Sequence, residues 1–225
     1  MLGRARVLKN KLTILFIFII QSFFVFSETT GISSSFIYFE EIKNNAISMF
    51  RASFSKYNVI LNKNEALFII KNTSLESAPD NLDGIYHPIR IKYLNTSSNL
   101  KIIGKQKLLG TPEAAYNGKD INLFEKILYS EIYPGIDIIY YGSKNDLTFD
   151  FVLKQGSNID DVLFEFDGVE RLSLDEKNNL IIHYKNKVVK QVSPKIYKLI
   201  NGQNEEVKGN IIIKNINQIG FIVKE

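Results

Sequence analysis

Two acidic residues, Asp137 and Asp150, are the side chains of this sequence whose types and spacing most readily suggest chemistry. They lie in the stretch 129–153, where two apolar runs flank the turn sequence Gly142-Ser-Lys-Asn145. If Tyr141 pairs with Asp146 across a hairpin, Asp137 lies directly opposite Asp150. Opposed carboxylates repel, so solvent, a basic side chain, a cation or a shared proton must offset their charges. A cation site and a general acid/base pair are the functional alternatives, and we favour solvated or backbone-bonded carboxylates at a sheet surface.

Other reactive side chains form no recognisable constellation. His87 and His183 are the only histidines, and a zinc site would need two further ligands. A Ser-His-Asp triad is compatible with the composition, but no G-x-S-x-G motif is present. The segment Gly104 to Gly110 lacks the lysine and the spacing of a phosphate-binding loop, and we interpret it as a loop between strands. We therefore expect no enzyme activity, no metal and no cofactor.

Tyrosines gather around the same hairpin: Tyr129, Tyr133, Tyr140 and Tyr141. Such rings stack on glycans, but tyrosine on half-buried strands is also ordinary β packing. A carbohydrate or adhesive binding module is therefore one alternative function, and a carboxylate-dependent hydrolase centred on Asp137 and Asp150 is another.

The hairpin that would position these residues is defined by alternation. In the expected register Ile136, Ile138, Tyr140, Leu147, Phe149 and Phe151 share one face. Further short runs rich in Ile, Val, Phe and Tyr recur between Asn, Gly and Asp clusters, at 57–61, 66–70, 89–94, 100–103, 162–168, 172–174, 180–184, 196–200, 210–214 and 220–223. This pattern predicts an all-β, antiparallel sandwich-like domain. Helical spacing at Phe39–Phe50 and Asp120–Glu131 adds one or two short helices to that expectation.

The N-terminal stretch is typical of a secretory signal. Residues 1–11 are basic, 12–26 are almost wholly apolar, and Val25 and Ser27 are small enough to precede a cleavage point. As a helix, 12–26 would span roughly 22 Å, short of a hydrocarbon core of about 30 Å, so we favour cleavage over an uncleaved anchor. We assign 1–27 to the signal peptide, 28–35 to a flexible lead-in and 36–225 to the β domain. The protein would then reach the periplasm, cell surface or medium, touching membrane only through an uncleaved signal.

Charge and composition limit the classes of partner that we expect. Four of the 28 basic residues lie in 1–27 and all 24 acidic residues follow it, so 28–225 is formally neutral. A neutral body lacks the positive surface that nucleic acid requires. The chain has no cysteine, which excludes disulfides and thiolate metal sites, so its core alone must stabilise it. An envelope protein or a glycan remains the expected partner.

The central motif resembles a known family. The run Tyr133-Pro-Gly-Ile-Asp137, Tyr140-Tyr-Gly142 and Leu147-Thr-Phe-Asp-Phe-Val152 is similar to a bacterial extracellular β domain of unknown function that precedes SBBP-type β-propeller repeats. The resemblance implies a structural motif of Tyr133, Pro134, Gly135, Ile136, Asp137, Tyr140, Tyr141, Gly142, Phe149, Asp150 and Phe151. It departs in having no Trp and only Ala115-Tyr-Asn-Gly118 upstream, and no propeller repeats follow before Glu225. It implies a non-catalytic envelope or surface module that stands without those repeats.

Overall fold

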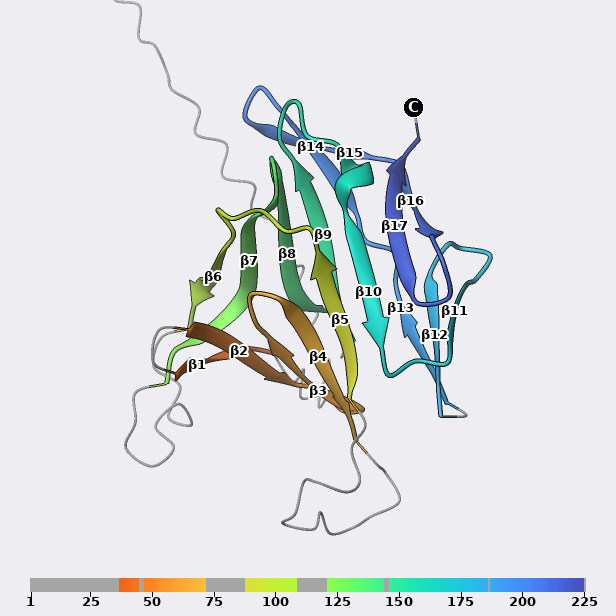
Figure 1. The fold of residues 1–225 in the computed structure, drawn as a ribbon. Coiled ribbons are helices and arrows are strands. Elements are labelled where there is room, and N and C mark those ends of the chain that lie inside the picture. The colour runs from red at the N-terminus through yellow and green to blue at the C-terminus, as the bar shows by residue number, and fades with distance from the viewer. Residues whose placement is uncertain are drawn as a thin grey trace, which may run out of the picture. The chain divides into compact units, whose positions relative to one another are not determined.

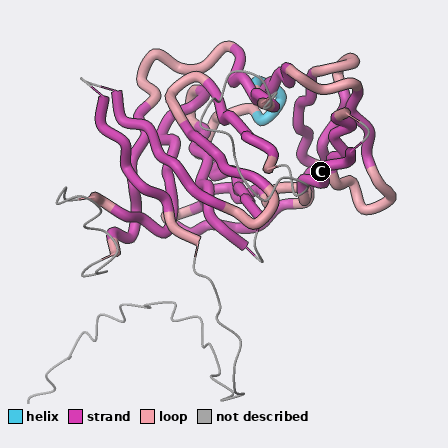
Figure 2. Tube along the Cα trace, turned by 90° about the horizontal axis from the view of Figure 1, so that it is seen from below, coloured by secondary structure: helices cyan, strands magenta, loops and turns pink. Residues whose placement is uncertain are grey.

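A computed structural model describes residues 37–44, 47–71, 88–108, 121–143, 146–185 and 187–224. The predicted signal peptide, the lead-in and His87 lie outside the described residues. Within them, no helix is both long and apolar enough to cross a membrane. Strands joined by short loops make up most of the described chain, as Figure 2 shows, and the one helix within it is the short 3-10 turn η3 (Ile159–Asp161). The predicted all-β fold is confirmed.

The first half of the domain supplies nine strands. They are β1 (Phe39–Asn44), β2 (Ile47–Ser53), β3 (Tyr57–Leu61), β4 (Glu65–Ile70), β5 (Ile89–Leu94), β6 (Lys101–Lys107), β7 (Leu123–Tyr133), β8 (Ile136–Ser143) and β9 (Asp146–Leu153). The second half supplies eight more: β10 (Leu163–Asp167), β11 (Arg171–Leu174), β12 (Leu180–Tyr184), β13 (Lys187–Gln191), β14 (Ile196–Ile200), β15 (Gln203–Val207), β16 (Gly209–Ile213) and β17 (Gln218–Val223).

These strands form two sheets. The large sheet has 14 strands in the order β15-β14-β9-β8-β7-β1-β2-β3-β4-β5-β10-β17-β16, with β6 paired to β7, and the small sheet has the order β11-β12-β13. All described pairs are antiparallel except β14 with β9, so the large sheet is mixed. Figure 1 shows the large sheet curling so that β5 and β10 stand in front of β8 and β9.

The core fills the space between the two halves of the curled sheet. Ring pairs cross it from β5 to β7 (Tyr93 and Tyr129, centroids 5.4 Å apart) and from β9 to β10 (Phe149 and Phe164, 6.0 Å). Period-two alternation produces this core, since β3 and β9 present every second residue to it. The result is a sandwich-like arrangement made largely from one folded-over sheet.

Both helix predictions are wrong. Phe39–Phe50 contains the hairpin of β1 and β2, in which Ile42 pairs with Met49, so the apparent helical face joined residues of two different strands. Asp120–Glu131 contains most of β7, which pairs with β6 along one edge and with β8 and β1 along the other. Pairing on both edges satisfies the β7 backbone and overrides a weak local helical pattern.

Candidate functional site

The central motif of the sequence runs from the end of β7 through β8 to β9 and contributes mainly to the core. Five of its side chains are almost completely buried: Tyr133, Ile136, Tyr140, Phe149 and Phe151. The Tyr140 hydroxyl is 3.0 Å from that of Tyr93, and burial raises the pKa of both phenols well above the usual value. These rings are therefore packing elements with internal hydrogen bonds, and they cannot stack on a ligand.

The register of this hairpin differs from the predicted one by two residues. Ser143 pairs with Asp146, so Asp137 lies opposite Val152 and Asp150 lies opposite Ile139. The predicted direct opposition of the two carboxylates is therefore wrong. The predicted buried face is nevertheless correct, because a shift of two residues leaves every side chain on the same side of the sheet.

Asp137 holds a β-bulge in the neighbouring strand. The β7–β8 register shifts between Tyr129 and Tyr133, and Glu131 within that interval has a φ of 55°. The Glu131 N–H donates to Asp137 Oδ1 at 2.7 Å, and Lys154 Nζ donates to the same oxygen at 3.1 Å. Asp137 therefore binds the Glu131 backbone and the Lys154 ammonium group of the same protein.

The Glu131 side chain completes this cluster. It forms an ion pair with Lys154 and accepts the Gly135 N–H at 3.1 Å, and the Lys154 bond is the main cause that lowers the pKa of Glu131. Gly135 has a φ of 71°, and a Cβ there would lie 2.9 Å from the Ser157 Cβ. The Pro-Gly turn of the motif therefore has a local structural explanation.

Asp150 has a separate structural task on the outer face of β9. It accepts the Tyr141 hydroxyl at 2.9 Å and the Lys195 N–H at 3.1 Å, just before β14 pairs in parallel with β9. Desolvation raises the pKa of Asp150, while these two bonds act in the opposite direction. Gly142 completes the motif, since a Cβ there would lie 2.6 Å from the Ile37 Cβ.

The structure brings one other reactive pair together, on the small sheet. Ser173 Oγ lies 3.0 Å from His183 Nε2, with both side chains half-buried on β11 and β12. Within the described parts of the chain, no carboxylate hydrogen-bonds to His183, so the third member of a triad is not in place. The predicted loop at 104–110 is wrong for its first residues, because β6 continues to Lys107.

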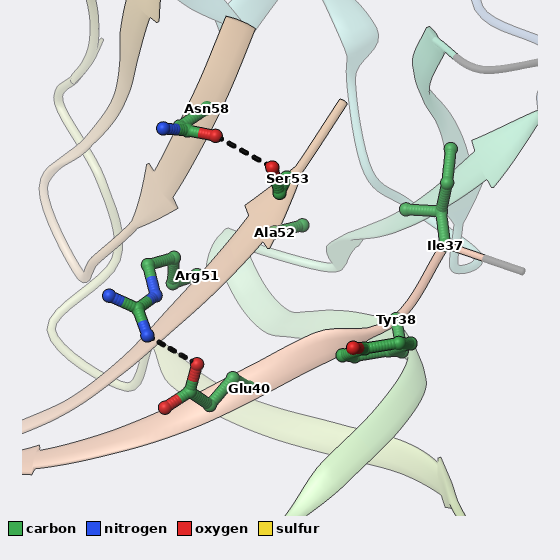
Figure 3. A pocket seen from close by; sticks show the side chains of 7 residues that line it. All are labelled: Ile37, Tyr38, Glu40, Arg51, Ala52, Ser53 and Asn58. Carbon is green, nitrogen blue, oxygen red and sulfur yellow. Dashed lines mark hydrogen bonds and ion pairs between the residues drawn. The ribbon is translucent and has the colours of Figure 1, made fainter. Parts of the chain in front are cut away.

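Two surface hollows were not predicted from the sequence. One, of about 670 Å³, lies beside Tyr133 and Pro134 of the motif and is also lined by Asp160, Asp161 and Lys214. The other, of about 480 Å³, lies on the outer face of β1, β2 and β3 (Figure 3). Its residues come from β1, β2, β3 and the two residues before β1, and only the pairing of Glu40 with Arg51 across the first hairpin could have indicated it.

The described residues hold no group of three or more His, Cys, Asp or Glu side chains placed to bind a metal ion. Fold and surface together define an all-β domain with a structural central motif and open polar hollows. The chain belongs to the family described as Domain of unknown function (DUF7948), whose model matches residues 39–225. No curated protein and no solved structure matches the chain.

Proposed function

We propose that this protein is an exported, non-catalytic module of the bacterial envelope or cell surface that binds an envelope protein or a glycan. The proposal rests on the hydrogen bonds that the two carboxylates of the motif form within the protein. Asp137 fixes the Glu131 bulge, and Asp150 fixes the entry to β14. Both acids are occupied by the fold, which supports a structural rather than a chemical role for the motif.

Export is supported by the N-terminal pattern and by the domain's composition. A basic start, an apolar run and small residues at Val25 and Ser27 are typical of a signal peptide. The domain has no cysteine, and its stability comes from a large aromatic and aliphatic core, which needs no particular redox environment.

The relationship to larger surface proteins is part of the same proposal. The motif resembles that of domains preceding SBBP-type propeller repeats, and we infer that this domain acts as the same kind of packing module. Two of its described edge strands carry charged side chains that disfavour edge-to-edge association. β6 carries Lys101, Lys105 and Lys107, and β15 carries Glu205 and Glu206.

Cell fractionation combined with N-terminal sequencing tests the proposal. A C-terminally tagged full chain should appear in the periplasmic, surface or culture fraction, with Glu28 as its first residue. A variant with Arg4, Arg6, Lys9 and Lys11 changed to Glu should stay in the cytoplasm with Met1-derived sequence intact. Recovery of the unaltered chain from the cytosol with its N-terminal segment attached would overturn the proposal.

A further inference from the structure

The hollow on the outer face of β1, β2 and β3 arises where two strands separate. The last pair of the β1–β2 ladder is Glu40 with Arg51, whereas β7 pairs with Phe39 and Glu40 along the opposite edge of β1. Tyr38 and Ser53 therefore stand apart with open surface between them. The remaining wall is Asn58 on β3, as Figure 3 shows.

Tyr38 provides this hollow with an accessible aromatic ring. It is 41% exposed and is the one aromatic among the exposed large hydrophobic side chains of the described residues. Most tyrosines of the central motif, by contrast, are buried. An exposed ring beside polar groups has an apolar face and a polar rim, which is the combination that an amphipathic ligand requires.

Arg51 on β2 and Asn58 on β3 are the donor-bearing planar side chains that line the same hollow as Tyr38. Asn58 Oδ1 accepts the Ser53 hydroxyl at 2.8 Å, and in Figure 3 its amide nitrogen points away from Ser53. Arg51 uses one guanidinium nitrogen on Glu40 Oε2, at 2.6 Å, and its side chain is 53% exposed. Each side chain therefore keeps donors for a ligand, since an amide carries two N–H groups and a guanidinium five.

The charges within the hollow cancel. Arg51 and Glu40 are the charged side chains that line the hollow and they pair with one another, while the neighbouring Lys71 ammonium donates to the Ser53 hydroxyl at 3.0 Å and to the Phe54 carbonyl at 2.6 Å. The strands that carry the donors lie about 4.8 Å apart, which places hydrogen-bonding groups at the scale of one sugar ring. Ring, donors and neutrality together favour an uncharged, hydroxyl-rich ligand with an apolar face.

We propose that this hollow binds an uncharged oligosaccharide, with Tyr38 stacking on a sugar ring and Arg51 and Asn58 hydrogen-bonding its hydroxyls. The inference deepens the proposed function and rests on it, because envelope polysaccharides are met only by an exported protein. Binding in vitro does not depend on export, however, so the two proposals fail separately.

The test uses the tagged full chain, purified in mild detergent and applied to an array of uncharged oligosaccharides and to insoluble chitin and cellulose. Binding to at least one uncharged glycan is expected. Tyr38→Ala and Arg51→Ala should each weaken binding tenfold or more, Asn58→Ala should weaken it severalfold, and Tyr38→Phe should leave the affinity within threefold.

Tyr197→Ala, which removes a partly exposed ring on β14, is the matched control and should bind like the unaltered chain. Thermal unfolding identifies any variant that has lost its fold, and the remaining variants then decide the result.

Three results would overturn the inference. If no uncharged glycan binds, the proposed class of ligand is wrong. If binding is unchanged in Tyr38→Ala and Arg51→Ala, the binding site lies elsewhere. Sedimentation showing a dimer that Tyr38→Ala dissociates would assign the hollow to a second copy of the chain. Binding confined to acidic glycans and abolished by 0.5 M salt would contradict the neutrality argument, since salt screens charge attraction.

Discussion

The side-chain amide of Asn178 hydrogen-bonds both backbone groups of Ile211, accepting its N–H at 2.6 Å and donating to its carbonyl at 3.1 Å. Ile211 lies on β16, the last strand of the large sheet, and Asn178 lies in the turn between β11 and β12. The amide thus takes the place of a further strand at this edge. It protects an apolar edge, and it also joins the small sheet to the large one.

Asn178→Gly should destabilise the domain by about 1–2 kcal/mol, because the Ile211 groups lose their partner. Glycine is the informative change, since Asn178 has a φ of 60° that alanine would strain. Urea unfolding measures the loss, and sedimentation should show new self-association through the uncovered edge. Asn204→Ala, on exposed β15, is the control. Unchanged stability and a monomeric Asn178→Gly variant would contradict the prediction.

The hydrogen bonds of Asp137 should contribute to stability and not to catalysis. Asp137→Ala leaves the Glu131 N–H without its acceptor and should cost about 1–3 kcal/mol, whereas Asp146→Ala, at an exposed strand end, should cost little. Chemical unfolding compares the two variants. Asp137→Asn and Asp150→Asn should also show no difference from the unaltered protein in a broad hydrolase screen, and an activity lost in both would revive the hydrolase alternative.

The Tyr93–Tyr140 hydrogen bond should appear as coupling in a double-mutant cycle. Each single Tyr→Phe change leaves a buried hydroxyl without its partner and should cost about 1–2 kcal/mol, while the double variant should lose less than the sum. Urea midpoints and slopes for the four proteins give the coupling. Strictly additive losses would show that the two hydroxyls act independently.

Asp175 should make the small sheet sensitive to acid. Lys190 is the first cause that lowers the pKa of Asp175, followed by Asn179, so its folded pKa lies below the unfolded one. The folded state then binds this proton more weakly than the unfolded state, and the stabilisation is present at neutral pH and declines as pH falls below about 4. The Tm difference between the unaltered protein and Asp175→Asn should therefore shrink from pH 7 to pH 3.

The control for this titration is Asp161→Asn, because Asp161 is exposed and its carboxylate makes no hydrogen bond within the described part of the chain. Its Tm difference should stay close to zero across the same range. A constant difference for Asp175→Asn from pH 7 to pH 3 would show that its charge does not contribute to stability.

Local side-chain alternation predicted much of this fold from sequence alone. The apolar runs at 57–61, 89–94, 180–184 and 196–200 were predicted as strands, and they coincide with β3, β5, β12 and β14. The inward face of β8 and β9 was also correct, because period two determines which side chains point inward. Fold class and core therefore follow from the sequence, whose apolar residues mark the buried face directly.

Strand partners and exact registers were decided only by the tertiary structure. Alternation cannot distinguish two registers that differ by two residues. The sequence therefore could not show that Asp137 and Asp150 do not lie directly opposite one another. It also could not show that the β1–β2 ladder would end at Glu40 and Arg51, beyond which the hollow beside Tyr38 opens. Contacts between distant segments depend on how the whole sheet curls, and no local pattern encodes that geometry.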